Sequence, residues 1–185
     1  MATIANPVSV VTAPWIPSDN GLLAATGDPG VYGSSNTLTA GTVYLVKIPI
    51  RAALTITNVW WALQTAGAGA STGSFSGIYS SAGSLLSGSS DIDAQLTGAA
   101  GGFSVPLTTP QAVAAGSFVW AAILSNLATT QPTLCRGLGT VGVPNLNLAA
   151  AVLRSATNGV GQTNLPASIT PAANAVGQNY WAGVN

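Results

Sequence analysis

Short bursts of alternating apolar and polar residues, separated by Gly, Ser, Thr and Asn, organise the middle of the chain. Thr42–Ile48 and Leu54–Gln64 are rich in β-branched and aromatic residues, which pack well on a pleated sheet. Ser117–Ser125 is apolar on both faces, as in a central strand that is buried on both sides. No apolar stripe at i, i+3, i+4 and i+7 accompanies the clusters of Ala, Gly and Ser. The pattern predicts an all-β protein.

Two local irregularities add detail to this prediction. The apolar phase within Leu54–Gln64 slips by one residue across Asn58 and Val59, which predicts a β-bulge. Gly83 lies between two strand-like segments and predicts a hairpin whose turn needs a positive φ. Pro49 is expected to end the first strand. Further strands are expected at Gly102–Leu107, Leu134–Arg136 and Ala151–Arg154.

The composition divides the chain into three parts. Residues 1–39 carry Pro7, Pro14, Pro17 and Pro29 and are predicted to form an extended N-terminal arm. Residues 40–155 contain the strong strand patterns and are predicted to form one β-sandwich domain of jelly-roll-like type. Residues 156–185 are predicted to be an irregular C-terminal tail.

The scarcity of charged side chains bears directly on function. Lys and Arg together number four, Asp and Glu together four, and histidine is absent, so 4% of the residues are charged. An average soluble domain has about 25%. General acid–base catalysis usually needs His or paired carboxylates, and a nucleophile needs a base beside it. We therefore predict that the protein is not an enzyme and that it has no catalytic residues.

The few reactive side chains give little support for a cofactor or metal. Asp91 and Asp93 are near each other in sequence, but Ca²⁺ takes six to eight oxygen ligands. A structural loop role for both is the simpler interpretation. Cys135 lies in an apolar stretch and is interpreted as a small buried hydrophobic residue, with a reactive thiol as the alternative. No cofactor and no metal are predicted.

Charge and hydropathy also restrict the partners. The basic residues Lys47, Arg51, Arg136 and Arg154 are scattered along the sequence, so no nucleic-acid partner is predicted. Apolar runs are far shorter than the ~20 residues of a membrane-spanning helix, and no membrane insertion is predicted. Residues 1–7 lack the features of a secretory signal, which predicts a protein made in a cytoplasm. A net charge of +0 favours association, so a homo-oligomer is expected.

Isolated aromatic residues are the candidates for a subunit interface. Trp15, Tyr180 and Trp181 lie in the two flanking segments, where either the chain's own sandwich or a neighbouring subunit could cover them. Trp60 and Trp61 are adjacent in a predicted strand, so one indole is expected in the core and the other on the outer face. The outer indole is a candidate for interface packing or for a sugar-binding platform. The predicted interface residues are Trp15, Trp60, Tyr180 and Trp181.

Several segments between residues 40 and 137 resemble a β-sandwich module of tailed-bacteriophage virion proteins, especially of phages that infect actinobacteria. In that module a strand ending in Gly-Leu/Ile-Tyr leads through Ser-x-Gly into a Leu-Leu strand, as residues 75–91 do here. Residues 56–60, 65–67, 107–113, 115–116, 119–124 and 130–134 also match, and residues 15–23 look like the start of such proteins.

This resemblance implies a jelly-roll-like sandwich, a trimeric assembly and a place in the virion. The implied function is that of a non-enzymatic minor tail protein whose partners are itself and other virion proteins. Two alternatives remain open, a capsid (head) decoration protein and an adhesin that binds host-surface glycan through exposed aromatic residues. The resemblance implies no catalytic residues.

Overall fold

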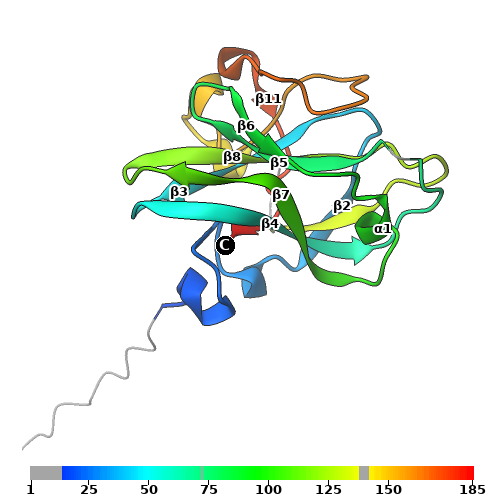
Figure 1. The fold of residues 1–185 in the computed structure, drawn as a ribbon, viewed down its shortest axis with the longest axis horizontal. Coiled ribbons are helices and arrows are strands. Elements are labelled where there is room, and N and C mark those ends of the chain that lie inside the picture. Colours follow the sequence, from blue (N-terminus) through cyan, green and yellow to red (C-terminus); the bar gives the residue numbers. More distant parts are fainter. Residues whose placement is uncertain (1–13, 72, 138–141) are drawn as a thin grey trace, which may run out of the picture.

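Two antiparallel sheets face each other across an apolar core in the computed structural model, which describes residues 14–71, 73–137 and 142–185 (Figure 1). The protein is an all-β two-sheet sandwich, as the sequence predicts. Its one α-helix within the described residues is the single turn α1 (Asp93–Leu96). The described residues also form five 3-10 turns, at Pro17–Asn20, Pro29–Val31, Val143–Asn145, Ala150–Val152 and Pro171–Ala173.

The first sheet is built around the long strand β4 (Leu54–Thr65). The path of paired strands through β4 is β1 (Ala24–Ala25), β12 (Ala182–Val184), β4, β9 (Thr133–Arg136) and β2 (Ser34–Thr37). The long strand β7 (Gly101–Val113) also pairs with β4. The predicted β-bulge is confirmed, because the register of β4 against β7 shifts between Ile56 and Asn58.

The second sheet has β8 (Ser117–Leu124) near its centre. Its order is β11 (Ala175–Val176), β10 (Ser155–Thr157), β3 (Tyr44–Ile50), β8, β5 (Phe75–Ser80) and β6 (Leu85–Gly88). The prediction of a central strand over Ser117–Ser125 is confirmed, because residues 119–124 are buried and β8 pairs on both sides. The hairpin of β5 and β6 is also confirmed, with Gly83 at φ +94° in its turn.

The core between the sheets follows the alternation of the long strands. On β4 the buried residues after the bulge are Val59, Trp61 and Leu63, so Trp61 is the indole that enters the core. Its Nε1 donates to Ser76 Oγ at 2.9 Å, and Ser76 Oγ donates to the carbonyl of Ala122 at 2.9 Å. The indole N–H of Trp61 and the hydroxyl of Ser76 therefore both have hydrogen-bond partners within the core.

Both flanking segments belong to the sandwich. β1 and β2 come from residues 1–39, and β11 and β12 come from residues 156–185, so the sheets extend beyond the predicted span of 40–155. The C-terminal residues 182–184 are not irregular, because β12 lies buried between β1 and β4. Leu153, Leu165 and Ile169 cover the outer face of the second sheet. Leu22 and Tyr32 cover part of the first.

Two strand predictions need correction. Ala151–Arg154 is not a strand, because residues 150–152 form a 3-10 turn and β10 begins only at Ser155. Pro49 does not end the first strand, which runs from Tyr44 to Ile50. The backbone N–H of Lys47 donates to Arg154 O, just before the first residue of β10. The nitrogen of Pro49, two residues further along β3, faces the same side, where no residue of β10 lies opposite it. A missing N–H costs nothing on an unpaired side of a strand.

Candidate binding groove

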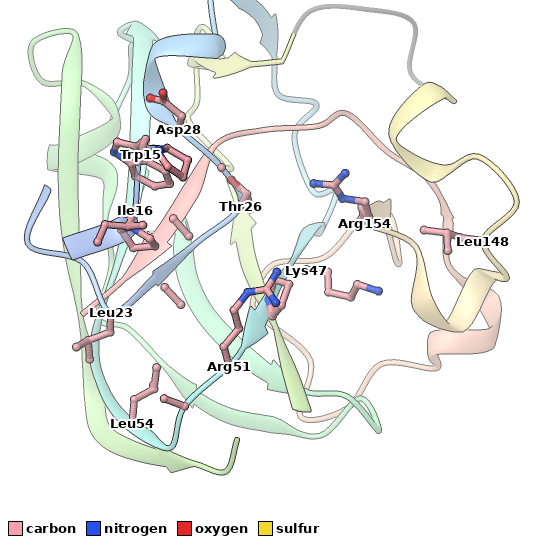
Figure 2. A pocket seen from close by; sticks show the side chains of 17 residues that line it. Trp15, Ile16, Leu23, Thr26, Asp28, Lys47, Arg51, Leu54, Leu148 and Arg154 are labelled. Carbon is pink, nitrogen blue, oxygen red and sulfur yellow. The ribbon is translucent and has the colours of Figure 1, made fainter. Parts of the chain in front are cut away.

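A groove of about 1030 Å³ opens where β10 stops covering β3, beside the edge strand β1 (Figure 2). Three parts of the chain line it: residues 14–17 and 23–28 of the N-terminal segment, residues around the end of β3, and the two residues Leu148 and Arg154. Pro49 lies on the groove wall, beyond the last β3 residue that pairs with β10, and offers no N–H for strand pairing there.

Three of the four basic residues line this groove, although they are scattered in the sequence. Lys47 is the most constrained of them. Its Nζ donates to the carbonyl of Val152 at 2.8 Å and lies 5.0 Å from the centre of the Phe118 ring. Burial and, second, the nearby charge of Arg154 lower the pKa of Lys47. Lys47 therefore secures the 142–154 segment to the sheet as well as adding charge.

Arg51 and Arg154 have exposed side chains with no hydrogen-bond or ion-pair partner in the described part of the chain. The backbone of Arg154 is nevertheless fixed, since its N–H donates to Asn145 Oδ1 at 2.6 Å and its carbonyl accepts from Lys47 N at 2.8 Å. In Figure 2 the side chains of Lys47 and Arg51 come from β3 and the residue that follows it, whereas that of Arg154 comes from the residue before β10. The site can thus present two guanidinium forks, that of Arg154 from a fixed backbone position.

Apolar side chains form the rest of the wall. Ile16 is 52% exposed and Leu23 is 51% exposed, and both line the groove with half-buried Trp15. Asp19 fixes this segment, because its carboxylate accepts from Ile16 N at 3.1 Å. The Trp15 indole is held by a hydrogen bond from Nε1 to Asn20 Oδ1 at 2.7 Å. The wall therefore combines fixed apolar surface with positive charge.

The four predicted interface residues lie in different environments. Tyr180 is 0% exposed and packs edge-on against Tyr44 with ring centres 5.5 Å apart, so the chain itself buries it. Trp181 is 6% exposed and donates to the carbonyl of Gly27. These two therefore leave a neighbouring subunit almost nothing to cover, and this corrects the prediction for both. Only Trp15, on the groove wall, and half-buried Trp60 retain accessible surface.

Trp60 lies on the outer face of the first sheet, opposite in direction to Trp61. It packs with Leu22, Tyr32 and Trp181, and its Nε1 donates to Asn185 Oδ1 at 3.0 Å. Burial raises the pKa of Tyr180 on the core side of this region. The exposed indole platform that a sugar ring would need is therefore partly occupied by the chain's own C-terminal residues.

The remaining reactive candidates lie apart from the groove. Asp91 accepts from Ser74 N at 3.2 Å and from Asp93 N at 3.0 Å, and Asp93 accepts from Ser71 N, so both hold loop backbone. Cys135 is half-buried rather than buried, and burial raises the pKa of its thiol. Among the described residues no three His, Cys, Asp or Glu side chains are grouped to hold a metal ion. None of the described helices has the length and hydropathy to cross a membrane.

No protein-family model matches this sequence, and a search of curated proteins gives no match. The groove thus has to be interpreted from its own chemistry. Its basic residues come from positions 47, 51 and 154, and no local motif links the last of these to the other two. The only sequence signal that bears on the groove is Pro49, which marks an interruption in a strand of otherwise strong β pattern.

Proposed function

We propose that the protein is a non-enzymatic structural component of a bacteriophage virion, a minor tail protein that assembles as a homotrimer. The resemblance of residues 40–137 to phage virion modules supports the virion role. The sandwich fold is compatible with it, and the segment that carries the most specific resemblance forms the hairpin of β5 and β6. Folds host many functions, so the fold alone carries no argument for this one.

The observation that carries the proposal is the apolar character of the exposed surface. Among the described residues, nine large hydrophobic side chains are more than a third exposed, while the whole chain has only eight charged residues. Six of the nine lie in the segment 143–176, which covers the second sheet: Val143, Leu146, Leu148, Val152, Val160 and Val176. A concentration of exposed apolar side chains in one segment is compatible with a protein interface. A role in assembly accounts for it.

Assembly rather than catalysis also fits the chemistry of the groove. Thr26 is the hydroxyl-bearing residue on its wall, and its Oγ1 donates to the carbonyl of Ala182 and accepts from Ala182 N. Asp28 holds the backbone N–H of Gly30 at 2.8 Å. A nucleophile needs a base within hydrogen-bond reach, and neither side chain has such a partner in the described residues.

Of the two alternatives, a capsid decoration protein shares every argument given above. A glycan-binding adhesin has less support, because Trp60 packs against the chain's own residues and its indole N–H is used by Asn185. Antibody labelling of purified particles of a phage that encodes the protein separates these roles. We expect labelled tails. Labelled heads would favour decoration, and particles that lack the protein would contradict the virion role.

A direct assay tests the absence of catalysis. Purified protein should leave peptidoglycan and host-surface glycan uncleaved. Cleavage that is abolished in Asp91→Asn or Asp93→Asn would overturn this part of the proposal. The circular dichroism spectrum of each variant must match that of the unchanged protein, because both carboxylates hold loop backbone.

A further inference from the structure

The positive charge of the groove exceeds the negative charge that the chain brings to it. Asp28 is the one side-chain carboxylate among the lining residues, against Lys47, Arg51 and Arg154. The other three side-chain carboxylates, Asp19, Asp91 and Asp93, are not among the lining residues. The residues outside the described ranges contain no Asp or Glu, so they cannot supply one. Any further carboxylate or phosphate side group that neutralises the remaining positive charge must come from a partner.

The spacing of the basic residues makes this arrangement unfavourable in the isolated chain. The charge of Arg154 is close enough to Lys47 to lower the pKa of that amine, after the larger effect of burial. Three positive charges that share one groove with a single carboxylate, that of Asp28, leave a net repulsion. In a chain with four basic residues, the fold could have placed them apart, yet three meet here. An anionic partner would turn this repulsion into attraction.

The two arginine side chains are the groups available to such a partner. Lys47 is already committed to Val152 O and the Phe118 ring. Each guanidinium carries five N–H donors in a planar fork that matches a carboxylate or phosphate in bidentate geometry. Arg51 and Arg154 stand on different segments of the groove wall (Figure 2). A partner that uses both must present at least two anionic groups.

The apolar part of the wall indicates what else the partner presents. Ile16, Leu23 and Leu148 are exposed and line the same groove as the arginines. Trp15 and Leu54 add further apolar surface. Covering such surface with apolar groups of a partner favours a complex, because it removes apolar area from water. A ligand with carboxylates alone would leave this surface wet.

We infer that the groove docks a peptide segment of a partner protein that carries at least two carboxylates among apolar side chains. This inference rests on the proposed assembly role and names the partner's chemistry. A polyphosphate backbone offers no apolar groups for Ile16, Leu23 and Leu148. A net charge of +0 also gives no long-range attraction to nucleic acid. The acidic, partly apolar peptide is the occupant that uses both halves of the wall.

Fluorescence anisotropy of labelled peptides tests the inference on the full chain. The probe is the peptide Asp-Leu-Asp-Leu-Glu-Phe, and its neutral match is Asn-Leu-Asn-Leu-Gln-Phe. We expect the acidic peptide to bind at least about tenfold more tightly than the neutral one, which is the effect of one or two charge-assisted hydrogen bonds. Its affinity should fall as NaCl is raised, because salt screens the interaction.

Variants locate the binding. The double variant Arg51→Gln, Arg154→Gln should weaken binding of the acidic peptide at least about tenfold. Arg136→Gln is the matched control, because Arg136 lies on β9 outside the groove and donates to Ser35 O. This control should bind as the unchanged protein does. Circular dichroism checks that all variants fold.

Three results would overturn the inference: no binding of the acidic peptide, equal binding of the neutral peptide, or unchanged binding by the double variant. Tighter binding of a single-stranded oligothymidylate than of the acidic peptide would assign the groove to polyanions instead. Sedimentation of the same samples tests the assembly role separately. A monomer that still binds the acidic peptide would contradict the assembly role and leave the groove's specificity standing, whereas an oligomer that does not bind it would do the reverse.

Discussion

The two edges of the sandwich differ in whether hydrogen bonds of the chain's own side chains join the two sheets there. On the side of β6 and β7, hydroxyl groups join the sheets: Ser87 Oγ accepts from Thr109 N at 3.1 Å, and Thr108 Oγ1 donates to the carbonyl of Gly88 at 3.0 Å. On the side of β1 and β3, the sheets leave a groove with exposed apolar and basic side chains. One side is completed by the chain's own groups, and the other side is not.

The residues on each side explain this difference. β7 is a long strand that pairs with β4 alone, and Pro106 and Pro110 lie in it. Proline on an edge strand prevents further strand pairing. On the opposite side, Pro49 occupies the part of β3 that β10 does not reach, so a strand cannot continue there either. Prolines prevent the pairing of a further strand at both edges. The edge at β6 and β7 is in addition closed by hydroxyl hydrogen bonds, whereas the edge at β1 and β3 leaves side chains open to contact.

The largest loss of stability is expected from a substitution in the core between the two sheets. Trp61→Ala should lower the free energy of unfolding by about 3–5 kcal/mol, because it removes a fully buried indole from between the sheets. Trp15→Ala is the matched control on the open side, where it should cost less than about 1 kcal/mol. Urea unfolding measures both. Equal losses would contradict the contrast between the two regions.

Alkaline pH should weaken the interior next. Burial raises the pKa of Tyr79 and of Tyr180 above the value of about 10 for an exposed tyrosine. The unfolded chain therefore loses these protons first, and the stability they contribute is present below about pH 10 and lost above it. Each group should remove about 1.4 kcal/mol per pH unit in that range. Lys47, whose pKa is lowered, acts in the opposite direction just below the ordinary lysine value.

Denaturant unfolding at a series of pH values measures this loss. Tyr79→Phe should reduce the loss above pH 10 but not abolish it, since Tyr180 and the thiol of Cys135, whose pKa values burial also raises, still titrate. At neutral pH the same variant should cost about 1 kcal/mol, because the hydroxyl of Tyr79 donates to the carbonyl of Pro166 at 2.8 Å. A stability that stays constant to the highest pH would contradict the burial of these hydroxyls.

The closed side itself is tested by a smaller change. Ser87→Ala should lower the free energy of unfolding by about 1 kcal/mol, because it removes the acceptor of Thr109 N and the contact of 3.2 Å with Thr108 Oγ1. Ser90→Ala, at an exposed position three residues along the chain, is the control and should have almost no effect. Thermal unfolding of the pair is sufficient. Indistinguishable values would show that the hydroxyl links do not join the sheets.

The smallest effect on stability is expected on the open side. Arg51→Gln with Arg154→Gln should change the free energy of unfolding by at most about 0.5 kcal/mol, and in the stabilising direction, because it relieves repulsion with Lys47. Denaturant unfolding at low salt is the sensitive measurement. A loss of more than about 1 kcal/mol would mean that the arginines hold the fold together, and the groove would then need no partner.

The sequence predicts the long central strands and the β5–β6 hairpin better than the short strands that pair beside the groove. The bulge in β4, the Gly83 hairpin and the buried strand β8 all follow from patterns of local periodicity. The strands β1 and β12 do not, because two or three Ala, Gly and Val residues give no such pattern. Their place in the sheet is decided by pairing between residues about 160 positions apart, which only the fold brings together.

The groove was beyond prediction for a related reason. Lys47 and Arg51 are near each other in sequence, but Arg154 joins them only through the pairing of β10 with β3. Tyr180 and Trp181 are predicted at an interface because the sequence of the C-terminal segment carries no strand pattern that would cover them. Once β12 pairs with β4, the adjoining aromatic residues are covered by their own chain.

We propose that this protein acts by association through its apolar surface. Sedimentation velocity of the intact chain tests this proposal most directly. At tens of micromolar protein we predict a species of trimer mass. It should be unchanged between about 0.1 M and about 1 M NaCl, because salt over that range screens charges but does not weaken apolar contacts. A monodisperse monomer, or a complex that dissociates as NaCl is raised, would contradict the account.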